Sequence, residues 1–241
     1  MKKLTLAVGA LALGANFALA DVVRMGSEGA YPPFNFINEN NELDGFEREL
    51  GDELCRRANL QCEWVINDWD TIIPNLIAGN YDTIIAGMSI TEARMEVIAF
   101  TQDYLPDDPS AYITLAGTPA DVIENGVVAA QSNTVQAGHV ATTNADLLEF
   151  PTPDETISAL RNGEVDAVLA DKGFLEAYVN DSNGELVFVG EGLSLGAGIG
   201  MGLRQSDTEL RATFDAVISE MKADGSLNAI ILNWFSEDMT Y

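Results

Sequence analysis

The sequence has few cations, few cysteines and one histidine, and each shortage excludes a class of function. Of 241 residues, 12 are Lys or Arg and 38 are Asp or Glu, which gives a formal net charge of −26. Nucleic-acid binding needs clustered basic side chains, so we expect no nucleic-acid partner. Two thiols and one histidine cannot supply an ordinary zinc site, and neither a metal nor a cofactor is expected. The acidity predicts a solvated acidic surface, suited to a saline habitat; a field that attracts cationic ligands is a weaker interpretation.

Long apolar runs are also absent after the first 20 residues, MKKLTLAVGALALGANFALA. This start combines two lysines, a mostly apolar stretch and a final Ala-Leu-Ala, the pattern of a secretory signal peptide with an A-x-A cleavage site. The alternative is an uncleaved anchor, but the apolar run is too short to span a bilayer and no charged stop follows it. We therefore expect residues 1–20 to be removed after Ala20. The mature chain would be soluble and start at Asp21, with ten Lys and Arg against 38 acids, a net charge of −28.

The two cysteines, Cys55 and Cys62, lie in the short segment CRRANLQC. Closely spaced cysteines in a secreted chain predict a disulfide. On one continuous helix their Cα atoms would be about 10 Å apart, which is too far to bridge. The helix must therefore end between them, and Asn59 suits a left-handed C-cap. The ring would contribute roughly 2.5 kcal/mol in the chain-entropy model.

Strand-like runs alternate with amphipathic helical segments along the rest of the chain. In GFERELGDELCRRA, the apolar residues Phe46, Leu50 and Leu54 are each four positions apart, which indicates one face of a helix. Helices are also predicted over DWDTIIPNLIAG, from about Thr91 and from about Asn133. This alternation predicts an α/β fold in which helices flank mostly parallel sheets.

Two segments have the composition of crossovers between two lobes. One is extended and interrupted by proline, at about Tyr104 to Thr114, and the other is glycine-rich, near Gly196 to Gly202. Dividing the chain at these segments places lobe 1 at residues 21–107 and 199–241, and lobe 2 at residues 108–198.

An arginine follows one of the predicted strands, in AGMSITEARMEVIAF. Arg94 lies in the first turns of the predicted helix, which Ser89 or Thr91 could cap. A guanidinium beside the free N–H groups of a helix N-terminus forms a cradle for a carboxylate. The alternative is a surface ion pair with Glu92 or Glu96.

An acidic residue, Asp171, directly follows another buried strand, in VLADKG. It could hold an ammonium group, or it could merely cap the next helix. In open α/β sheets, ligands bind outside the carboxyl ends of the strands. We therefore expect Asp171 and Arg94 to lie at the same ligand site. Together they describe a receptor for a zwitterion. Two aromatic residues near other strand ends, Tyr31 and Trp69, are explained by packing when each is taken alone.

Six motifs together carry a family resemblance through nearly the whole chain after residue 20. They occur in the order EGAYPPFNF, LDGFERELGDEL, WDTIIPNLIAGNYDTIIAGMSITEAR, IAFTQDY, GEVDAVLAD and GMGLRQSDTELRATFDAVISEMKADGS. The sequence resembles the extracellular solute-binding proteins of polar amino acid ABC transporters. The resemblance implies the two-lobed periplasmic type II fold with two hinge crossovers, and a monomer that delivers an amino acid to an inner-membrane ABC permease. CRRANLQC is similar to the disulfide loop of the lysine/arginine/ornithine and histidine binders.

The resemblance also implies how the charged groups of an amino acid would be held. The α-carboxylate would bind the Arg94 guanidinium and the Ser89 and Val135 amides. The α-ammonium would bind Asp171, the Ser89 hydroxyl and the Gly87 carbonyl. One departure from the family lies beside Val135, because Asn133-Thr134-Val135 replaces a common Gly-Thr-Thr and a hydroxyl is lost. Another is Ala86-Gly87, where some binders of basic amino acids have serines.

The ligand side chain, by the same resemblance, would lie between Tyr31 and Trp69, with Glu28 facing its distal end. Glu28 would supply a countercharge and the two aromatic rings could make cation–π contacts. We therefore expect a cationic ligand: arginine, lysine, ornithine, histidine or an opine. A polar neutral amino acid such as glutamine is the alternative, because Glu28 could accept hydrogen bonds from an amide.

Two rival functions remain on the same fold. A secreted cyclohexadienyl dehydratase would need a general acid or base in the cleft, whereas the single histidine, His139, reads as helix surface. A sensor domain would be expected to carry transmembrane and signalling segments, which the sequence lacks. We therefore expect a binding protein and not an enzyme.

Overall fold

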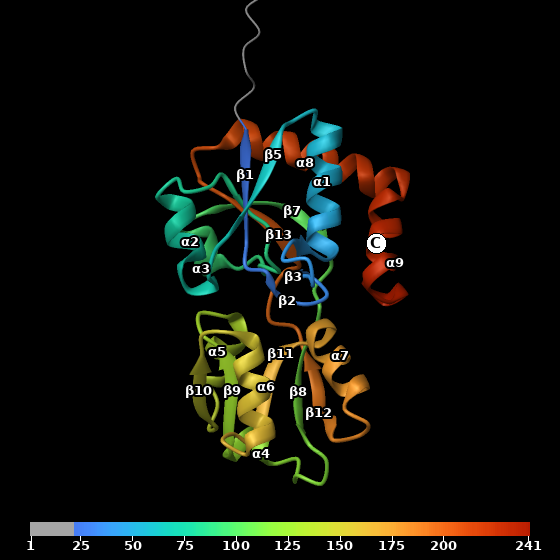
Figure 1. Ribbon diagram of the computed structural model, residues 1–241. Helices are drawn as coiled ribbons and strands as arrows, with labels where there is room; N and C mark the ends of the chain where they lie inside the picture. The colour runs from blue at the N-terminus through green and yellow to red at the C-terminus, as the bar shows by residue number, and fades with distance from the viewer. Residues whose placement is uncertain (1–21) are drawn as a thin grey trace, which may run out of the picture.

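The computed structural model describes residues 22–241. The expected signal peptide, its cleavage after Ala20 and the mature start at Asp21 lie outside the described residues. Two lobes are stacked end to end, each with a central sheet flanked by helices, and two segments of chain connect them (Figure 1). No helix in this part of the chain is both long enough and apolar enough to cross a membrane.

Lobe 1 is built on a five-stranded sheet in the order β5-β1-β6-β13-β7. The first three strands are parallel, and β13 is antiparallel to both of its neighbours. The strands are β1 (Val23–Ser27), β5 (Cys62–Ile66), β6 (Thr83–Ile84), β7 (Ala99–Leu105) and β13 (Ile199–Leu203). The flanking helices are α1 (Phe46–Ala58), α2 (Trp69–Ile77), α3 (Glu92–Met95), α8 (Thr208–Asp224), α9 (Ser226–Trp234) and the 3-10 turn η1 (Glu237–Met239).

A small antiparallel sheet, which the sequence pattern does not predict, lies at the cleft side of lobe 1. Its three strands are β2 (Ala30–Tyr31), β3 (Asn35–Ile37) and β4 (Leu43–Asp44). They are only two or three residues long, too short for an alternating apolar pattern to stand out. This sheet shapes the chain that carries Glu28 and Tyr31.

Lobe 2 repeats the strand pattern of lobe 1 in the order β10-β9-β11-β8-β12. The first three strands are again parallel, and β8 is antiparallel to both of its neighbours. The strands are β8 (Ser110–Leu115), β9 (Val127–Gln131), β10 (Asp146–Phe150), β11 (Ala167–Asp171) and β12 (Leu186–Leu193). The helices are α4 (Val122–Asn125), α5 (Val135–Val140), α6 (Pro153–Asn162) and α7 (Lys172–Asp181). The expected α/β fold of two sheet-based lobes is confirmed.

The two connections between the lobes are shorter than the sequence predicted. One joins the end of β7 at Leu105 to the start of β8 at Ser110, and the other joins Leu193 to Ile199. Residues 110–114, expected within the first crossover, are instead buried in the middle of the lobe 2 sheet. They belong to a strand because β11 and β12 pair with both of its edges.

The disulfide expected in lobe 1 is present between Cys55 and Cys62. Asn59 ends α1 in the left-handed conformation, with φ 53°. The resulting turn brings the two Cα atoms to 6.3 Å from each other. The C-cap therefore makes the bridge possible, as the spacing predicted.

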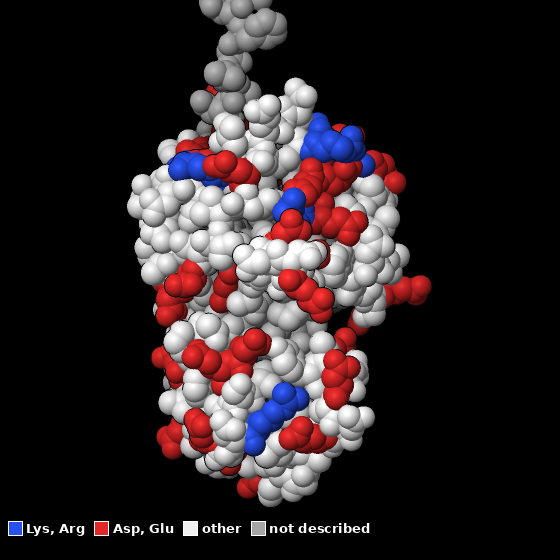
Figure 2. Space-filling model, in the orientation of Figure 1, with Lys and Arg blue, Asp and Glu red and all other residues white. Residues whose placement is uncertain are grey.

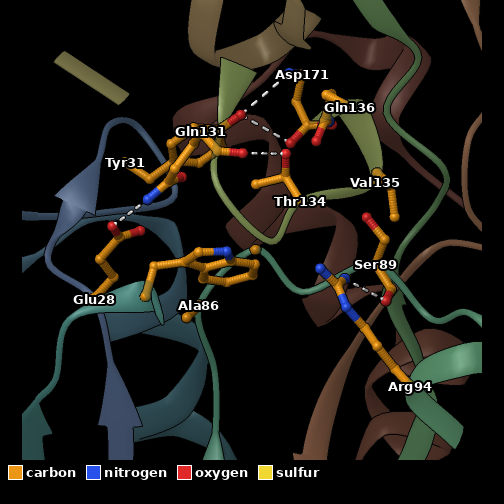
Figure 3. Close-up of a pocket in the computed structure, with 12 residues that line it drawn as sticks. Glu28, Tyr31, Ala86, Ser89, Arg94, Gln131, Thr134, Val135, Gln136 and Asp171 are labelled. Atoms are coloured by element: carbon orange, nitrogen blue, oxygen red, sulfur yellow. Dashed lines mark hydrogen bonds between the residues drawn. The ribbon is translucent and has the colours of Figure 1, made fainter. Parts of the chain in front are cut away.

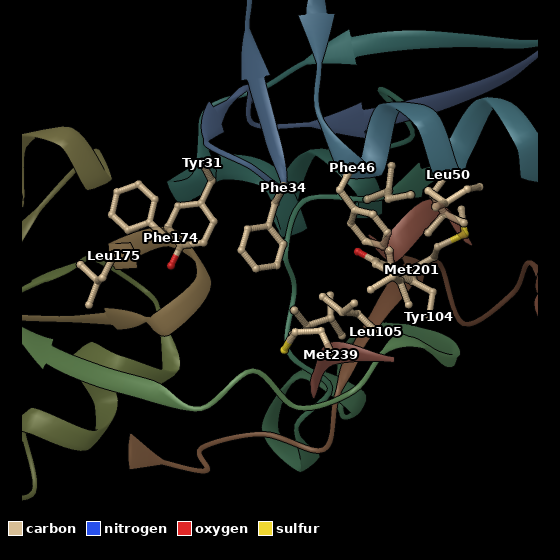
Figure 4. Close-up of a cluster of buried hydrophobic side chains, with 14 of the residues drawn as sticks. Tyr31, Phe34, Phe46, Leu50, Tyr104, Leu105, Phe174, Leu175, Met201 and Met239 are labelled. Atoms are coloured by element: carbon tan, nitrogen blue, oxygen red, sulfur yellow. The ribbon is translucent and has the colours of Figure 1, made fainter. Parts of the chain in front are cut away.

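Aromatic side chains join the cores of the two lobes beside the cleft (Figure 4). Tyr31 of lobe 1 stacks on Phe174 of lobe 2, with ring centroids 4.4 Å apart and planes 7° from parallel. Phe34 contacts Tyr31 on the lobe 1 side, at 5.4 Å between centroids. The lobes are thus in direct contact beside the cleft.

Candidate ligand-binding site

A small cavity, with a volume of about 20 Å³, lies between the lobes. All eight residues assigned a role in the sequence analysis line it: Glu28, Tyr31, Trp69, Gly87, Ser89, Arg94, Val135 and Asp171. Four others without an assigned role line it too: Ala86, Gln131, Thr134 and Gln136. Residues of both lobes line the cavity, so neither lobe forms it alone.

Arg94 reaches the cavity from a single helical turn, shorter than the apolar-faced helix expected. Thr91 is the N-cap, and its hydroxyl accepts a hydrogen bond from the Arg94 N–H at 3.2 Å. The guanidinium donates to the Ser89 carbonyl at 2.9 Å and, across the cleft, to the Asn133 carbonyl at 3.3 Å. It also lies 5.4 Å from the centre of the Trp69 ring. Burial lowers the pKa of Arg94 to about 10, so the side chain stays charged at neutral pH.

The alternative role of Arg94 is not observed. In the described part of the chain it forms no ion pair with Glu92 or Glu96, both of which are exposed. A guanidinium that is bound only by carbonyl oxygens keeps its positive charge available to an anion in the cavity.

Asp171 lies on the lobe 2 side, as the last residue of β11. Its carboxylate accepts hydrogen bonds from the Tyr31 hydroxyl at 2.9 Å and the Gln136 amide at 2.8 Å. Burial raises the pKa of Asp171 to about 6, while the Tyr31 hydrogen bond opposes the rise.

The capping alternative for Asp171 is wrong. Asp171 occupies the N-cap position of α7, but its side chain makes no capping bond. The Gly173 N–H in the first turn donates instead to Asp108, at 2.8 Å. Asp108 comes from the first crossover, so a residue distant in sequence caps the helix and leaves the Asp171 carboxylate facing the cleft.

A third buried charge, Glu28, lies just beyond β1. The side chain is 8% exposed, and its Oε1 accepts a hydrogen bond from the Gln131 amide of lobe 2 at 2.7 Å. Burial raises the pKa of Glu28 to about 7, with the acids Asp68 and Asp70 adding to the rise and the Gln131 bond opposing it. The carboxyl is therefore poised to change charge near neutral pH.

Gln131 and Gln136 were missed by sequence reasoning, for different reasons. Gln131 is the last residue of β9, so the rule that selected Asp171, a polar residue at the end of a buried strand, could have found it. Gln136 lies inside α5 and contacts Asp171 and Ser110 from there. Only the docking of α5 against β11 shows that its side chain reaches the site.

The helix α5 presents its N-terminus to the cavity, at Val135. The Thr134 hydroxyl caps it by accepting from the Ala137 N–H at 3.1 Å. Backbone N–H groups in a first helical turn lack partners within the helix and suit an anion. His139, further along α5, does not line the cavity.

The three charged groups approach the cavity from different sides (Figure 3). Arg94 and Glu28 lie at opposite ends, and Asp171 projects from lobe 2 between them. One fixed cation and two acids with raised pKa values match a small molecule that carries one anionic group and cationic or hydrogen-bond-donating groups.

Comparisons with known proteins agree with this geometry. Residues 23–237 match the family model of the bacterial extracellular solute-binding proteins, family 3. The lysine/arginine/ornithine-binding periplasmic protein of Escherichia coli is 31% identical over 98% of this chain and 97% of its own length. The histidine-binding periplasmic protein of Salmonella typhimurium is 32% identical over 99% of both chains. These relatives are binding proteins, so the dehydratase alternative finds no support.

A solved structure is similar at higher identity. It is a periplasmic His/Glu/Gln/Arg/opine family-binding protein from Silicibacter pomeroyi, crystallised in complex with lysine. It is 62% identical to this chain, with a TM-score of 0.88, and the match covers 91% of this chain and 99% of that one.

Proposed function

This chain belongs to the bacterial extracellular solute-binding proteins of family 3, and we propose that it is the receptor that binds a cationic amino acid and delivers it to an ABC permease. The observation that carries the proposal is the set of three charged groups, Glu28, Arg94 and Asp171, around one cavity between the lobes. An amino acid with a cationic side chain has three charges of the opposite signs, in a matching order.

The α-carboxylate and α-ammonium are assigned to opposite faces of the cleft. The carboxylate would bind the Arg94 guanidinium and the Ser89 and Val135 amides. The ammonium would bind Asp171, the Ser89 hydroxyl and the Gly87 carbonyl. In support, Arg94 has only carbonyl partners, and Asp171 accepts hydrogen bonds from neutral groups alone.

The distal charge of the ligand is assigned to Glu28, with Tyr31 and Trp69 along the side chain. Gln131 occupies one carboxylate oxygen of Glu28 and leaves the other without a protein hydrogen bond among the described residues. A cation beside Glu28 would stabilise its ionised form. The names of the relatives, which bind lysine, arginine, ornithine or histidine, support this ligand class.

Glutamine is the second candidate, and one observation favours it. With a pKa of about 7, Glu28 is partly protonated at neutral pH, and a neutral carboxyl can both donate to and accept from a side-chain amide. A ligand amide would then avoid the cost of ionising a buried carboxyl.

The proposed function also implies how the rest of the chain works as a receptor. We place lobe 1 at residues 21–107 and 199–241 and lobe 2 at 108–198, with closure by bending of the two short connections. The protein would act as a monomer in the periplasm, after export on the Sec pathway and cleavage after Ala20, and would dock on an inner-membrane permease. Ligand favours closure only by its higher affinity for the closed state.

Calorimetric titration of the wild type with lysine, arginine, ornithine, histidine and glutamine tests the proposal. The variant Glu28→Gln, which keeps shape and removes charge, should lose more than tenfold in affinity for a cationic ligand and change little for glutamine. Glu63→Gln removes the same charge from an exposed position of β5 and is the matched control. If glutamine alone binds, the cationic assignment is wrong; if none of the five binds, the amino-acid assignment is wrong.

A further inference from the structure

A fully buried carboxylate, Glu47, lies outside the cavity and has no role in the proposed binding scheme. It belongs to the first turn of α1. Its Oε1 accepts hydrogen bonds from the Gly87 N–H at 2.6 Å and from the Tyr104 hydroxyl, and its Oε2 accepts from the Asn35 amide at 2.7 Å. Burial raises its pKa, and these three hydrogen bonds oppose the rise. A buried acid with no cationic partner is costly, so its presence calls for an explanation.

Two of the three donors to Glu47, Gly87 and Asn35, connect it to the ligand site, and the third, Tyr104, lies near a connection between the lobes. Gly87 lines the cavity itself, in the loop that leads to Ser89. Asn35 uses its other amide atom, Oδ1, to accept a hydrogen bond from the Gly29 N–H at 2.7 Å, directly beside Glu28. Tyr104 lies on β7, one residue before the first connection between the lobes.

The backbone of the same helical turn holds the aromatic part of the site. The Phe46 N–H donates to the Pro33 carbonyl at 2.9 Å, and the Glu47 N–H donates to the Phe34 carbonyl at 2.8 Å. The start of α1 therefore contacts the turn that follows Tyr31 as well as the two loops tied by the Glu47 side chain. These segments are far apart in sequence and meet at this one helical turn.

We propose that Glu47 is a positioning residue that sets both ends of the ligand site at once, holding Gly87 at the α-ammonium end and, through Asn35, the Glu28 loop at the distal end. The assignment of the two ends rests on the proposed function. The position requires a group that only accepts hydrogen bonds, because all three of its neighbours are donors.

The variant Glu47→Gln tests the requirement for an acceptor. Its amide nitrogen must face either Gly87 or Asn35. If it faces Asn35, the Asn35 side chain must flip to present its oxygen, and its amide nitrogen then meets the Gly29 N–H. In either orientation two donors face each other beside a site residue. We expect the affinity for L-lysine to fall more than tenfold.

A compensating change distinguishes this mechanism from general destabilisation. In Glu47→Gln combined with Asn35→Asp, the amide introduced at position 47 donates to the carboxylate introduced at position 35, which also accepts from Gly29. Every hydrogen bond is restored with the acid and the amide exchanged, at the same net charge and nearly the same shape. The double variant should bind L-lysine within about threefold of the wild type. Asn35→Asp alone places two carboxylates in contact, so its affinity for L-lysine should be lower than that of the double variant.

Three measurements make the outcome decisive. First, Ile218→Val, in the buried face of α8, destabilises lobe 1 without touching the site loops and should leave affinity unchanged. Second, 6-aminohexanoate lacks the α-ammonium, so the preference of Glu47→Gln for L-lysine over this analogue should shrink if the Gly87 end is displaced. Third, the Gly87 and Gly29 amides should exchange with solvent faster in Glu47→Gln and slowly again in the double variant, with no ligand present.

The failure of this proposal is separable from the failure of the proposed function. If the wild type binds L-lysine and Glu47→Gln binds it equally well, Glu47 does not position the site. If the single variant does not fold, the double variant carries the test, and its failure to recover binding overturns the proposal. If the wild type binds no lysine, the ligand assignment fails, and the amide-exchange pattern still decides the role of Glu47.

Discussion

The two lobes have the same sheet topology, and both are acidic, but they differ in how many cations they contain. Residues 108–198 contain only two of the ten cations that follow residue 20, Arg161 and Lys172, and 14 of the 38 acids. Both cations lie on the surface, within 3.7 Å and 3.3 Å of Glu185 and Glu176. In lobe 1, arginines such as Arg57 and Arg204 each contact several acids. On the face shown in Figure 2, Lys and Arg atoms accordingly lie mostly on lobe 1.

This difference explains what each lobe contributes to the cleft. Lobe 1 supplies the fixed cation, Arg94, already oriented by the Ser89 carbonyl. Lobe 2 supplies Asp171, whose hydrogen-bond donors are all neutral and whose nearest favourable charge is Arg94 across the cleft. A buried carboxylate that is not paired with a cation gains most when a ligand brings an ammonium group. Ligand binding and lobe contact are therefore expected to reinforce each other.

Removing the cation of lobe 1 should have the largest effect. Arg94→Ala is expected to weaken every amino-acid ligand by a similar factor, because it removes the carboxylate anchor and not a selective contact. The cost should be about 2–5 kcal/mol, the range for losing one member of a buried charge pair. Calorimetry measures it, with Arg161→Ala on lobe 2 as the control that removes an equal surface charge. Wild-type affinity in Arg94→Ala would contradict the assignment.

Removing the acid of lobe 2 should have a somewhat smaller effect. Asp171→Asn keeps an acceptor for the Tyr31 hydroxyl but loses the charge, so we expect a loss of about 1.5–3 kcal/mol in affinity. Asp146→Asn, exposed on β10, is the control. Because burial raises the pKa of Asp171 to about 6, wild-type affinity should also fall below that pH, and the variant should lack this acid limb. Tight binding by Asp171→Asn would show that the α-ammonium of the ligand does not depend on the Asp171 carboxylate.

The pH dependence of Glu28 should produce an intermediate effect. With a pKa of about 7 in the free protein, Glu28 is protonated below neutral pH and ionised above it. A cationic ligand needs the ionised form, so its binding releases a proton and its affinity rises with pH until about 7 and then levels off. Between pH 8 and pH 6 the loss should be about tenfold for one linked proton. Calorimetry in two buffers of different ionisation enthalpy counts the released protons, and Glu28→Gln should abolish the release.

The disulfide should have the smallest effect on binding. It braces lobe 1 at the end of α1, and the described part of lobe 2 contains no cysteine. Reduction should cost roughly 2.5 kcal/mol of stability in the chain-entropy model, while affinity stays within about twofold. Thermal unfolding with and without reductant measures the stability, and calorimetric titration under the same two conditions measures the affinity. Two titratable thiols in the native protein would show that the bridge is absent.

Much of the fold could be read locally because its signals are local. Each of these signals depends on residues a few positions apart: the apolar residues four positions apart in α1, the C-cap at Asn59 and the disulfide between Cys55 and Cys62. The ends of the buried strands β6 and β11 likewise directed attention to Arg94 and Asp171. The β8 strand was misplaced in a crossover because its pairing with β11 and β12 involves partners more than 50 residues away.

By itself, the sequence determined the alternation of elements, the disulfide and the types of charge available to a site, since these follow from neighbours along the chain. Tertiary structure alone decided that Asp108 caps α7 in place of Asp171, that Gln131 meets Glu28, and that Glu47 ties together three distant segments. The physical reason is the same in each case. A buried polar group takes the partner that tertiary packing, within a lobe or between the lobes, brings within about 3 Å, and that partner lies 40 to 103 residues away.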